Sequence, residues 1–182
     1  MTEPQRFTQE EIQPLPRWAR LGFAARCVQR ARGLVQGSAE QVRVIERAIA
    51  LVRDASRRGQ ASEELADAAA AAYTLALNEV DLAHQPGEAG GEEDDRLVVL
   101  CTVAHAAAFA AEAATIAVAR MAGFLVTQSV DFAVQAHVVA CPEQVSEVLA
   151  AMRRDLESLQ EAVQQEGWGN LTQVPVDFFD SL

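Results

Sequence analysis

Apolar residues recur at helical intervals along almost the whole chain. Within residues 39–58, for example, Val42, Ile45, Ile49 and Val52 are three or four positions apart and so share one face of a helix. No comparable alternation of apolar and polar residues indicates a strand. The pattern therefore predicts an all-α protein with about six helices, over residues 15–36, 39–58, 62–83, 96–120, 124–140 and 142–167.

Capping residues mark several ends of these helices. Thr8 with Glu11, and Ser38 with Gln41, have the spacing of capping boxes, and the first pair predicts a short helical turn at the start of the chain. We expect a kink near Gly123 to separate the fourth helix from the fifth. Two stretches lack the helical pattern: an acidic, glycine-rich loop over residues 84–95 and an irregular aromatic tail over residues 167–182.

The most apolar stretch, residues 97–119, is long enough to cross a membrane. It is dominated by alanine and carries His105 and Glu112. An acid near the centre of a membrane span costs about 2.5–3.5 kcal/mol, and alanine contributes little to insertion. We therefore expect this stretch to be the buried central helix of a single-domain bundle spanning residues 1–182, without a membrane partner.

Charge is distributed unevenly along the chain. All fifteen basic residues are arginine, and the net charge is −11. Residues 1–60 hold eleven arginines and six acids, whereas residues 61–182 hold four arginines and twenty acids. A negative net charge argues against sequence-independent binding of nucleic acid or anionic lipid. The simplest interpretation is that the two halves attract each other within one fold.

The first long helix carries five arginines among apolar residues, so we expect some of them to pair with acids of later helices. Glu112 and Asp131 each lie in an apolar helical run, where an unpaired charge would be costly. We expect Glu112 to be mostly buried and paired with an arginine of the first helix. The residues assigned to this structural role are Arg17, Trp18, Arg20, Arg26, Glu112 and Asp131.

Candidate catalytic and metal-binding residues are few. Cys27, Cys101 and Cys141 form no CxxC motif, which predicts neither a disulfide framework nor a zinc site and favours a reducing, cytoplasmic location. The first residues show no pattern of a signal peptide. Cys101 and His105 are one helical turn apart, but we expect their helix to be wholly buried and the thiol to be inert.

A metal site could use the histidines, because helical bundles bind metals through Glu and His on facing helices. Asp81 with His84, and His105 with Glu112, have spacings that keep both residues on one face, yet no Glu-x-x-His pair occurs, and His137 stands apart. The sequence therefore predicts no catalytic residue, metal or cofactor, and a metalloenzyme using His84 and His105 stays an alternative.

Acidic and aromatic residues are the candidates for partner binding. The tail aromatics have two interpretations: they cover one end of the bundle, which we favour, or they dock on a partner. The acids of the loop and of the sixth helix predict a negative surface suited to a basic partner. The candidate contact residues are Glu92, Glu93, Asp94, Asp95, Glu143, Glu147, Glu161, Trp168, Phe178 and Phe179.

The stretch LPRWARLGFAARCVQRARGL, residues 15–34, resembles the start of all-helical bacterial proteins associated with polymorphic-toxin immunity. The segments VIERAIALV and VPVDFFDSL are similar to parts of the same group. The resemblance covers less than half of the chain. It implies a small cytoplasmic protein that binds and blocks a cognate toxin, and it implies no catalytic residues. A regulatory adaptor of a bacterial defence or signalling operon is the first alternative.

Overall fold

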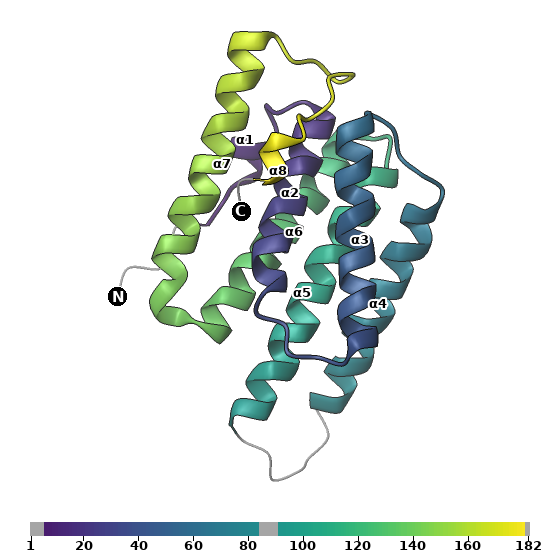
Figure 1. The fold of residues 1–182 in the computed structure, drawn as a ribbon, viewed down its shortest axis with the longest axis vertical. Coiled ribbons are helices and arrows are strands. Elements are labelled where there is room, and N and C mark those ends of the chain that lie inside the picture. The colour runs from purple at the N-terminus through teal and green to yellow at the C-terminus, as the bar shows by residue number, and fades with distance from the viewer. Residues whose placement is uncertain (1–5, 84–90, 181–182) are drawn as a thin grey trace.

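The computed structural model describes the backbone of residues 6–83 and 91–180, and within these ranges it leaves the side chains of residues 79–83, 92, 93 and 180 undescribed. It is all-helical over the described residues, as the sequence predicts (Figure 1). The elements are α1 (Gln9–Ile12), α2 (Arg17–Arg32), α3 (Ala39–Arg58), α4 (Glu64–Ala83), α5 (Glu92–Thr115), α6 (Ala119–Ala140), the 3-10 turn η1 (Pro142–Gln144), α7 (Val145–Glu166) and α8 (Asp177–Asp180).

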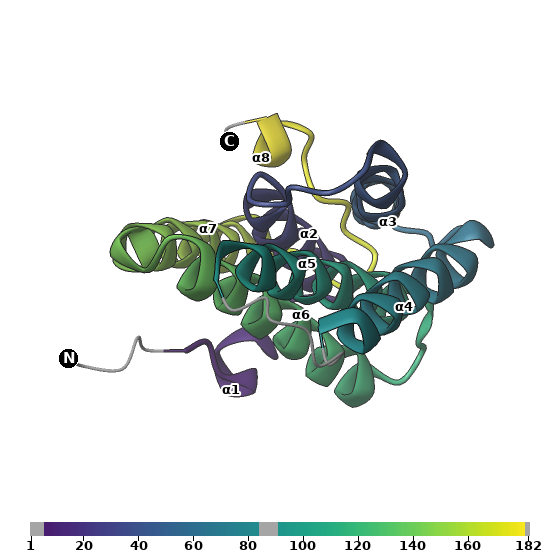
Figure 2. The same ribbon diagram turned by 90° about the horizontal axis from the view of Figure 1, so that it is seen from below.

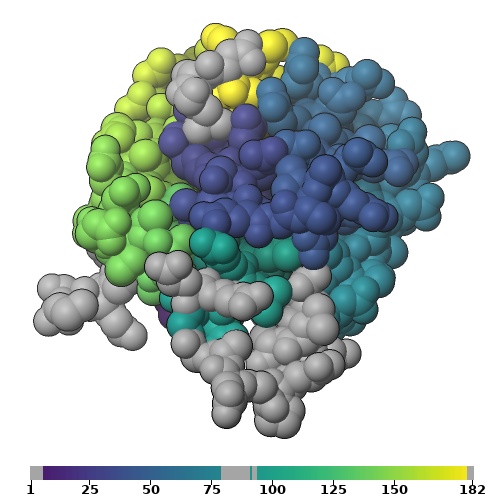
Figure 3. Space-filling view, turned by 60° about the horizontal axis from the view of Figure 1, so that its bottom comes forward, coloured from purple at the N-terminus to yellow at the C-terminus, as the bar shows by residue number. Residues whose placement is uncertain are grey.

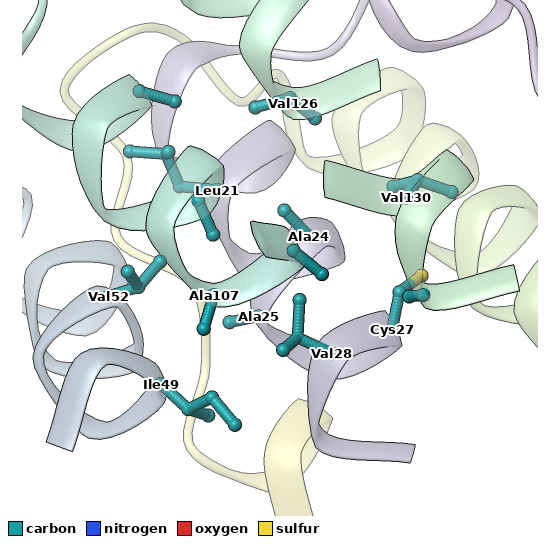
Figure 4. Packing of buried hydrophobic residues seen from close by; sticks show 14 of the residues in the cluster. Leu21, Ala24, Ala25, Cys27, Val28, Ile49, Val52, Ala107, Val126 and Val130 are labelled. Atoms are coloured by element: carbon teal, nitrogen blue, oxygen red, sulfur yellow. The ribbon is translucent and has the colours of Figure 1, made fainter. Parts of the chain in front are cut away.

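Helix α5 lies at the centre of the bundle, which confirms the predicted architecture. It packs against α4 and α6 on one side and against α2 and α3 on the other (Figure 2). Its small side chains allow this close approach: Ala104, Ala106, Ala107 and Ala108 are fully buried. Branched residues of the neighbouring helices, such as Val28, fill the space around them (Figure 4).

Helix α5 also contains the one described stretch that is long and apolar enough to cross a membrane, Asp94–Thr115. Two-thirds of this stretch (67%) is buried inside the protein. Most of its side chains thus face the other helices, as in the core helix of a bundle.

The capping boxes form as the sequence predicts. The Thr8 hydroxyl accepts the Glu11 backbone N–H, and the Glu11 carboxylate accepts the Thr8 N–H. Ser38 and Gln41 make the same exchange at the start of α3, which ends at Gly59 in the left-handed conformation. These local signals therefore define both ends of α3.

Several predicted bounds were wrong. The first long helix was expected to reach residue 36, but α2 ends at Arg32. The break between the fourth and fifth helices falls at residues 116–118, and Gly123 lies inside α6. A Cβ at Gly123 would overlap the Gln13 side chain and lie 3.1 Å from Arg20 Nη1, so this glycine serves close packing and not a kink. The predicted loop 84–95 is also shorter, because residues 92–95 form the first turn of α5, and residues 84–90 lie outside the described ones. The tail is not wholly irregular, since it contains α8.

Close packing around α5 predicts that enlarging one of its alanines destabilises the bundle. We expect Ala107→Leu to lower the free energy of unfolding by about 1–3 kcal/mol, because overpacking forces neighbouring side chains to shift. Urea unfolding followed by circular dichroism measures the change. The matched control is Ala70→Leu on the exposed face of α4, for which we expect a change within about 0.5 kcal/mol. Equal stability of Ala107→Leu and wild type would contradict a tightly packed centre.

Candidate functional site

Two arginines of α2 converge on a single buried acid of α7. Arg26 Nε lies 3.0 Å from Asp155 Oδ2, and Arg30 Nη2 lies 2.8 Å from the same oxygen. The side chains of Arg26 and Asp155 are only 6% and 9% exposed. Such a buried charge is tolerated only when it is paired. The expected pairing of the arginine helix with a later helix is therefore present, but through an acid that the sequence analysis did not single out.

The other arginines of α2 have separate partners. Arg17 donates to the carbonyl of Ala114 at 2.8 Å, in the last turn of α5, where carbonyl oxygens lack partners within the helix. Arg20 donates to the carbonyl of Ala119 at 3.2 Å. These two contacts hold the break between α5 and α6 against α2. Arg32 forms an ion pair with Glu46 of α3.

The predicted arginine partner of Glu112 was wrong. Glu112 is half-buried, and it accepts a hydrogen bond of 2.6 Å from the Tyr73 hydroxyl of α4. It makes no ion pair with any described residue. Glu112 lies on the side of α5 that packs against α4, so the Tyr73 hydroxyl contacts it and no arginine of α2 does. Burial and the Glu112 carboxylate raise the pKa of Tyr73.

Asp131 also lacks the expected arginine of α2. Burial raises its pKa, and the charge of Arg6, outside α2, partly offsets that effect. Its Oδ1 is buried and accepts no hydrogen bond from any described residue. The fold thus partly desolvates the Asp131 carboxylate, and its described contacts do not fully offset the free-energy cost of that desolvation.

The two described histidines, His105 and His137, form no metal site with other described residues. His105 stacks on Phe132, with ring centroids 5.1 Å apart, and His137 is buried in α6, where burial lowers its pKa. His84 lies outside the described residues. Among the described residues, no group of three His, Cys, Asp or Glu side chains could hold a metal ion.

Cys101 and His105 are adjacent, but their geometry does not activate the thiol. Both are half-buried and not wholly buried as predicted, and Cys101 Sγ lies 3.6 Å from His105 Nδ1. The same Nδ1 lies 3.1 Å from the Cys101 carbonyl oxygen, which can only accept a hydrogen bond. A protonated Nδ1 satisfies that carbonyl and cannot take the proton of the thiol. Cys101 Sγ is instead 3.3 Å from the carbonyl of Ala76, to which it donates.

The aromatic tail packs on its own bundle. Val174 and Phe179 are each only 2% exposed, and Figure 3 shows the tail in yellow between the green of α7 and the blue of α3. Phe178 lies against the Arg26 guanidinium at 4.6 Å, and Phe179 against Arg53 at 5.0 Å. Trp168 is half-buried and donates to Glu166 at 2.7 Å. Phe179 is therefore not available as a docking surface in this arrangement.

The acidic candidates on α7 and η1 point into solvent. Glu143, Glu147 and Glu161 are exposed, and Glu157 on the same outer face, which the sequence analysis missed, is exposed too. None of the four forms an ion pair with a described residue. Helix periodicity could have found Glu157, since it is four positions before Glu161. At the start of α5, Asp95 is exposed and Asp94 half-buried, while the side chains of Glu92 and Glu93 are not described.

Part of the opposite charge of the two halves is used inside the fold. Besides the Asp155 pairs, Arg47 of α3 contacts Glu64 at 2.9 Å. Glu11 and Arg153 of α7 also pair, at 2.7 Å, but there the acid belongs to the N-terminal half and the arginine to the C-terminal half. The Asp155 and Arg47 pairs confirm that the halves attract each other within one domain. The four acids on the outer face of η1 and α7 remain outside this pairing.

The ion pairs of Asp155 predict a large cost for losing its charge. We expect Asp155→Asn to lower the free energy of unfolding by about 3–5 kcal/mol, because two guanidinium groups at a buried position lose their counter-charge. Denaturant unfolding measures the loss. Glu157→Gln, an exposed neutralisation on the same helix, is the control and should change stability by less than about 0.5 kcal/mol. Similar values for both variants would refute the role given to Asp155.

Neutralising Asp131 is expected to raise the free energy of unfolding, whereas neutralising Asp155 is expected to lower it. Its folded-state pKa lies above the ordinary value of 3.8, so the native state binds a proton more readily than the unfolded state. Stability from this group is therefore present at low pH and is lost as the pH rises through the raised value. We expect Asp131→Asn to be more stable than wild type at neutral pH, and the gain to vanish below pH 3.8. Thermal unfolding at both pH values tests this, and a variant less stable at neutral pH would contradict it.

Comparison with known proteins adds no relative to this description. The chain matches no family model, no curated protein and no solved structure.

Proposed function

We propose that this protein acts by stoichiometric binding of a basic protein partner, as a cytoplasmic immunity protein that neutralises a cognate bacterial toxin. The observation that carries the proposal is the row of exposed acids Glu143, Glu147, Glu157 and Glu161 on one side of the molecule. The resemblance of residues 15–34 to immunity proteins supports the class of partner.

The arrangement of these acids suits recognition of a positive surface. The acids from Glu147 onward lie on one continuous helix, so their spacing is fixed, and only the exposed Arg154 on the same helix opposes their charge. A fixed row of like charges attracts a basic partner at a distance and orients it before contact. Many toxins that act on nucleic acid are basic for the same electrostatic reason, since they must bind phosphate.

The attachment of α7 adds to this suitability. Asp155 ties the helix to α2, and Arg153 ties it to Glu11, so both of these charged residues face inward. The outward carboxylates are therefore presented by a helix whose Asp155 carboxylate and Arg153 guanidinium each pair with a residue of another helix. A binding surface of this kind needs no rearrangement before association, which lowers the free-energy cost of binding.

The experiment compares two triple variants with the same change of net charge. Glu143→Gln, Glu147→Gln and Glu161→Gln neutralise the proposed surface. Glu40→Gln, Glu63→Gln and Asp67→Asn neutralise exposed acids of α3, of the turn before α4 and of α4, and these two helices lie at the opposite side in Figure 1. The partners to be tested are the proteins encoded by the genes on either side of this gene, and we expect one of them to contain a toxin domain. We expect the first variant to associate about tenfold more slowly at low salt and to lose most of its salt dependence, and the control to behave like wild type.

Growth of cells that express the toxin domain gives the functional readout. Wild-type protein should restore growth, and a stoichiometric complex should be recovered. A rate that is insensitive to salt in all three proteins would contradict the electrostatic surface. Binding to a non-toxic neighbour would indicate the adaptor alternative, and stoichiometric metal in the purified protein would indicate the enzyme alternative.

A further inference from the structure

The middle of α2 and the carboxyl end of α3 form a groove that is shaped for an extended segment of chain. Gly22 opens its floor: a Cβ there would lie 3.3 Å from Val174 Cγ2 and 3.5 Å from Phe179 Cζ. Ser56 lies fully buried beside it. A larger residue than glycine at position 22 would therefore take up space that the tail now fills.

The groove also offers hydrogen-bond acceptors that its own helix cannot satisfy. The last four carbonyls of a helix have no partner within that helix. At the end of α3, the Ser56 carbonyl accepts the backbone N–H of Val174 at 3.1 Å, and the Arg58 carbonyl accepts Gln173 Nε2 at 3.2 Å. The tail thus caps α3 from more than a hundred positions further along the sequence.

Two arginines complete the groove by providing flat cationic surfaces for aromatic rings. The Arg26 guanidinium lies 4.6 Å from the ring centre of Phe178, and Arg53 lies 5.0 Å from that of Phe179. Each contact adds a cation–π attraction to the burial of the ring. The groove therefore selects a backbone donor, an apolar side chain and an aromatic pair in a fixed order, which residues 173–179 supply. We call these residues the docking segment.

The stretch that joins the docking segment to α7 is held much more loosely. No atom lies within 4 Å of a Cβ built at Gly167 or Gly169, and Leu171 is 89% exposed. Its contacts with the bundle are few: the Arg17 N–H donates to Asn170 Oδ1 at 3.2 Å, the half-buried Trp168 packs against the core, and the Leu171 carbonyl oxygen lies 3.6 Å from a Cβ built at Gly59. The grip of the tail is thus concentrated in the docking segment, and the connection before it is an exposed, glycine-containing hinge.

We propose that the groove between α2 and α3 is the docking surface for the tail of a second copy of the chain, so that docking segments exchange between two molecules. Every contact of the groove is the same whether the segment comes from its own chain or from the other, which makes exchange a low-cost route to a dimer. The hinge keeps a chain's own segment at an effective concentration in the millimolar range, so dimers form when the protein is concentrated. This proposal is independent of the partner proposed for α7.

The experiment uses two wild-type preparations that carry different affinity tags. They are mixed at high concentration, incubated and diluted, and one tag is then captured. We expect the second tag to be captured with it. An excess of the free peptide of residues 170–182 should suppress capture about tenfold, because it fills vacated grooves, whereas the same peptide with Phe179→Ala should have no effect.

Two full-length variants serve as matched controls within the tail. Phe179→Ala removes the buried ring and should abolish capture, while Leu171→Ala changes an exposed hinge residue and should leave it intact. No capture of the wild-type protein would overturn the proposal. Capture that persists with Phe179→Ala in both copies, or that the peptide does not suppress, would place the contact on another surface and also overturn it.

Direct binding of the fluorescent peptide separates the second copy from other occupants. We expect it to bind the full-length Phe179→Ala chain at least about tenfold more tightly than wild type, whose groove is filled. Peptide binding without exchange between chains would overturn the proposal and leave the groove as the site of the chain's own tail alone. If Phe179→Ala does not fold, the wild-type mixing experiment with the two peptides still decides the question.

Discussion

The ion pairs between Asp155 and the two arginines of α2 are the contact on which the outer part of the structure depends. Helix α7 contacts α2 and α6, and through Arg153 it also contacts Glu11 of α1. Asp155 is its buried charge at the contact with α2. Leu156 and Leu159 beside it are also buried, so apolar packing and a charged contact act at the same place. The charge fixes the position of α7, because a buried carboxylate has few other places where it is compensated.

The same arginine connects this contact to the tail. Arg26 has the Asp155 carboxylate on one side and the ring of Phe178 near its face. The tail in turn satisfies the carbonyls at the end of α3 and covers Ser56. Helices α2, α3 and α7 and the tail are therefore coupled through a few polar contacts, whereas α4, α5 and α6 are held together by the packing of alanine and valine.

The molecule thus has an apolar, closely packed centre around α5 and a charged outer face on α7. The alanine-rich packing around α5 brings the helices close together through apolar contacts, which need no hydrogen-bond partners. The acids on the outer face of α7 project from a helix that the Asp155 pairs hold in place. A protein that recognises a partner by charge needs such a fixed presentation, because an attraction between mobile side chains is weakened by their entropy and by salt.

The sequence by itself determined the local features of the protein. The capping boxes at Thr8 and Ser38, the end of α3 at Gly59 and the alanine-rich character of α5 were all predicted, because hydrogen bonds over three or four positions decide them. The burial of the central helix followed from its composition. Where local signals were ambiguous, as at Gly123, the helix boundary was wrong.

Only the tertiary structure decided which charged residues meet. Asp155 lies in a helix with many acids, and no local pattern distinguishes it from its exposed neighbours; it meets Arg30 across 125 positions of sequence. Glu112 was predicted to pair with an arginine because its sequence neighbours are apolar, yet its partner in the structure is the Tyr73 hydroxyl of α4. Likewise, the sequence did not determine whether the tail packs on its own bundle. The tertiary structure decides this, because carbonyl groups at the end of α3 accept hydrogen bonds from the tail. Partners of this kind depend on how whole helices pack, which a one-dimensional pattern does not specify.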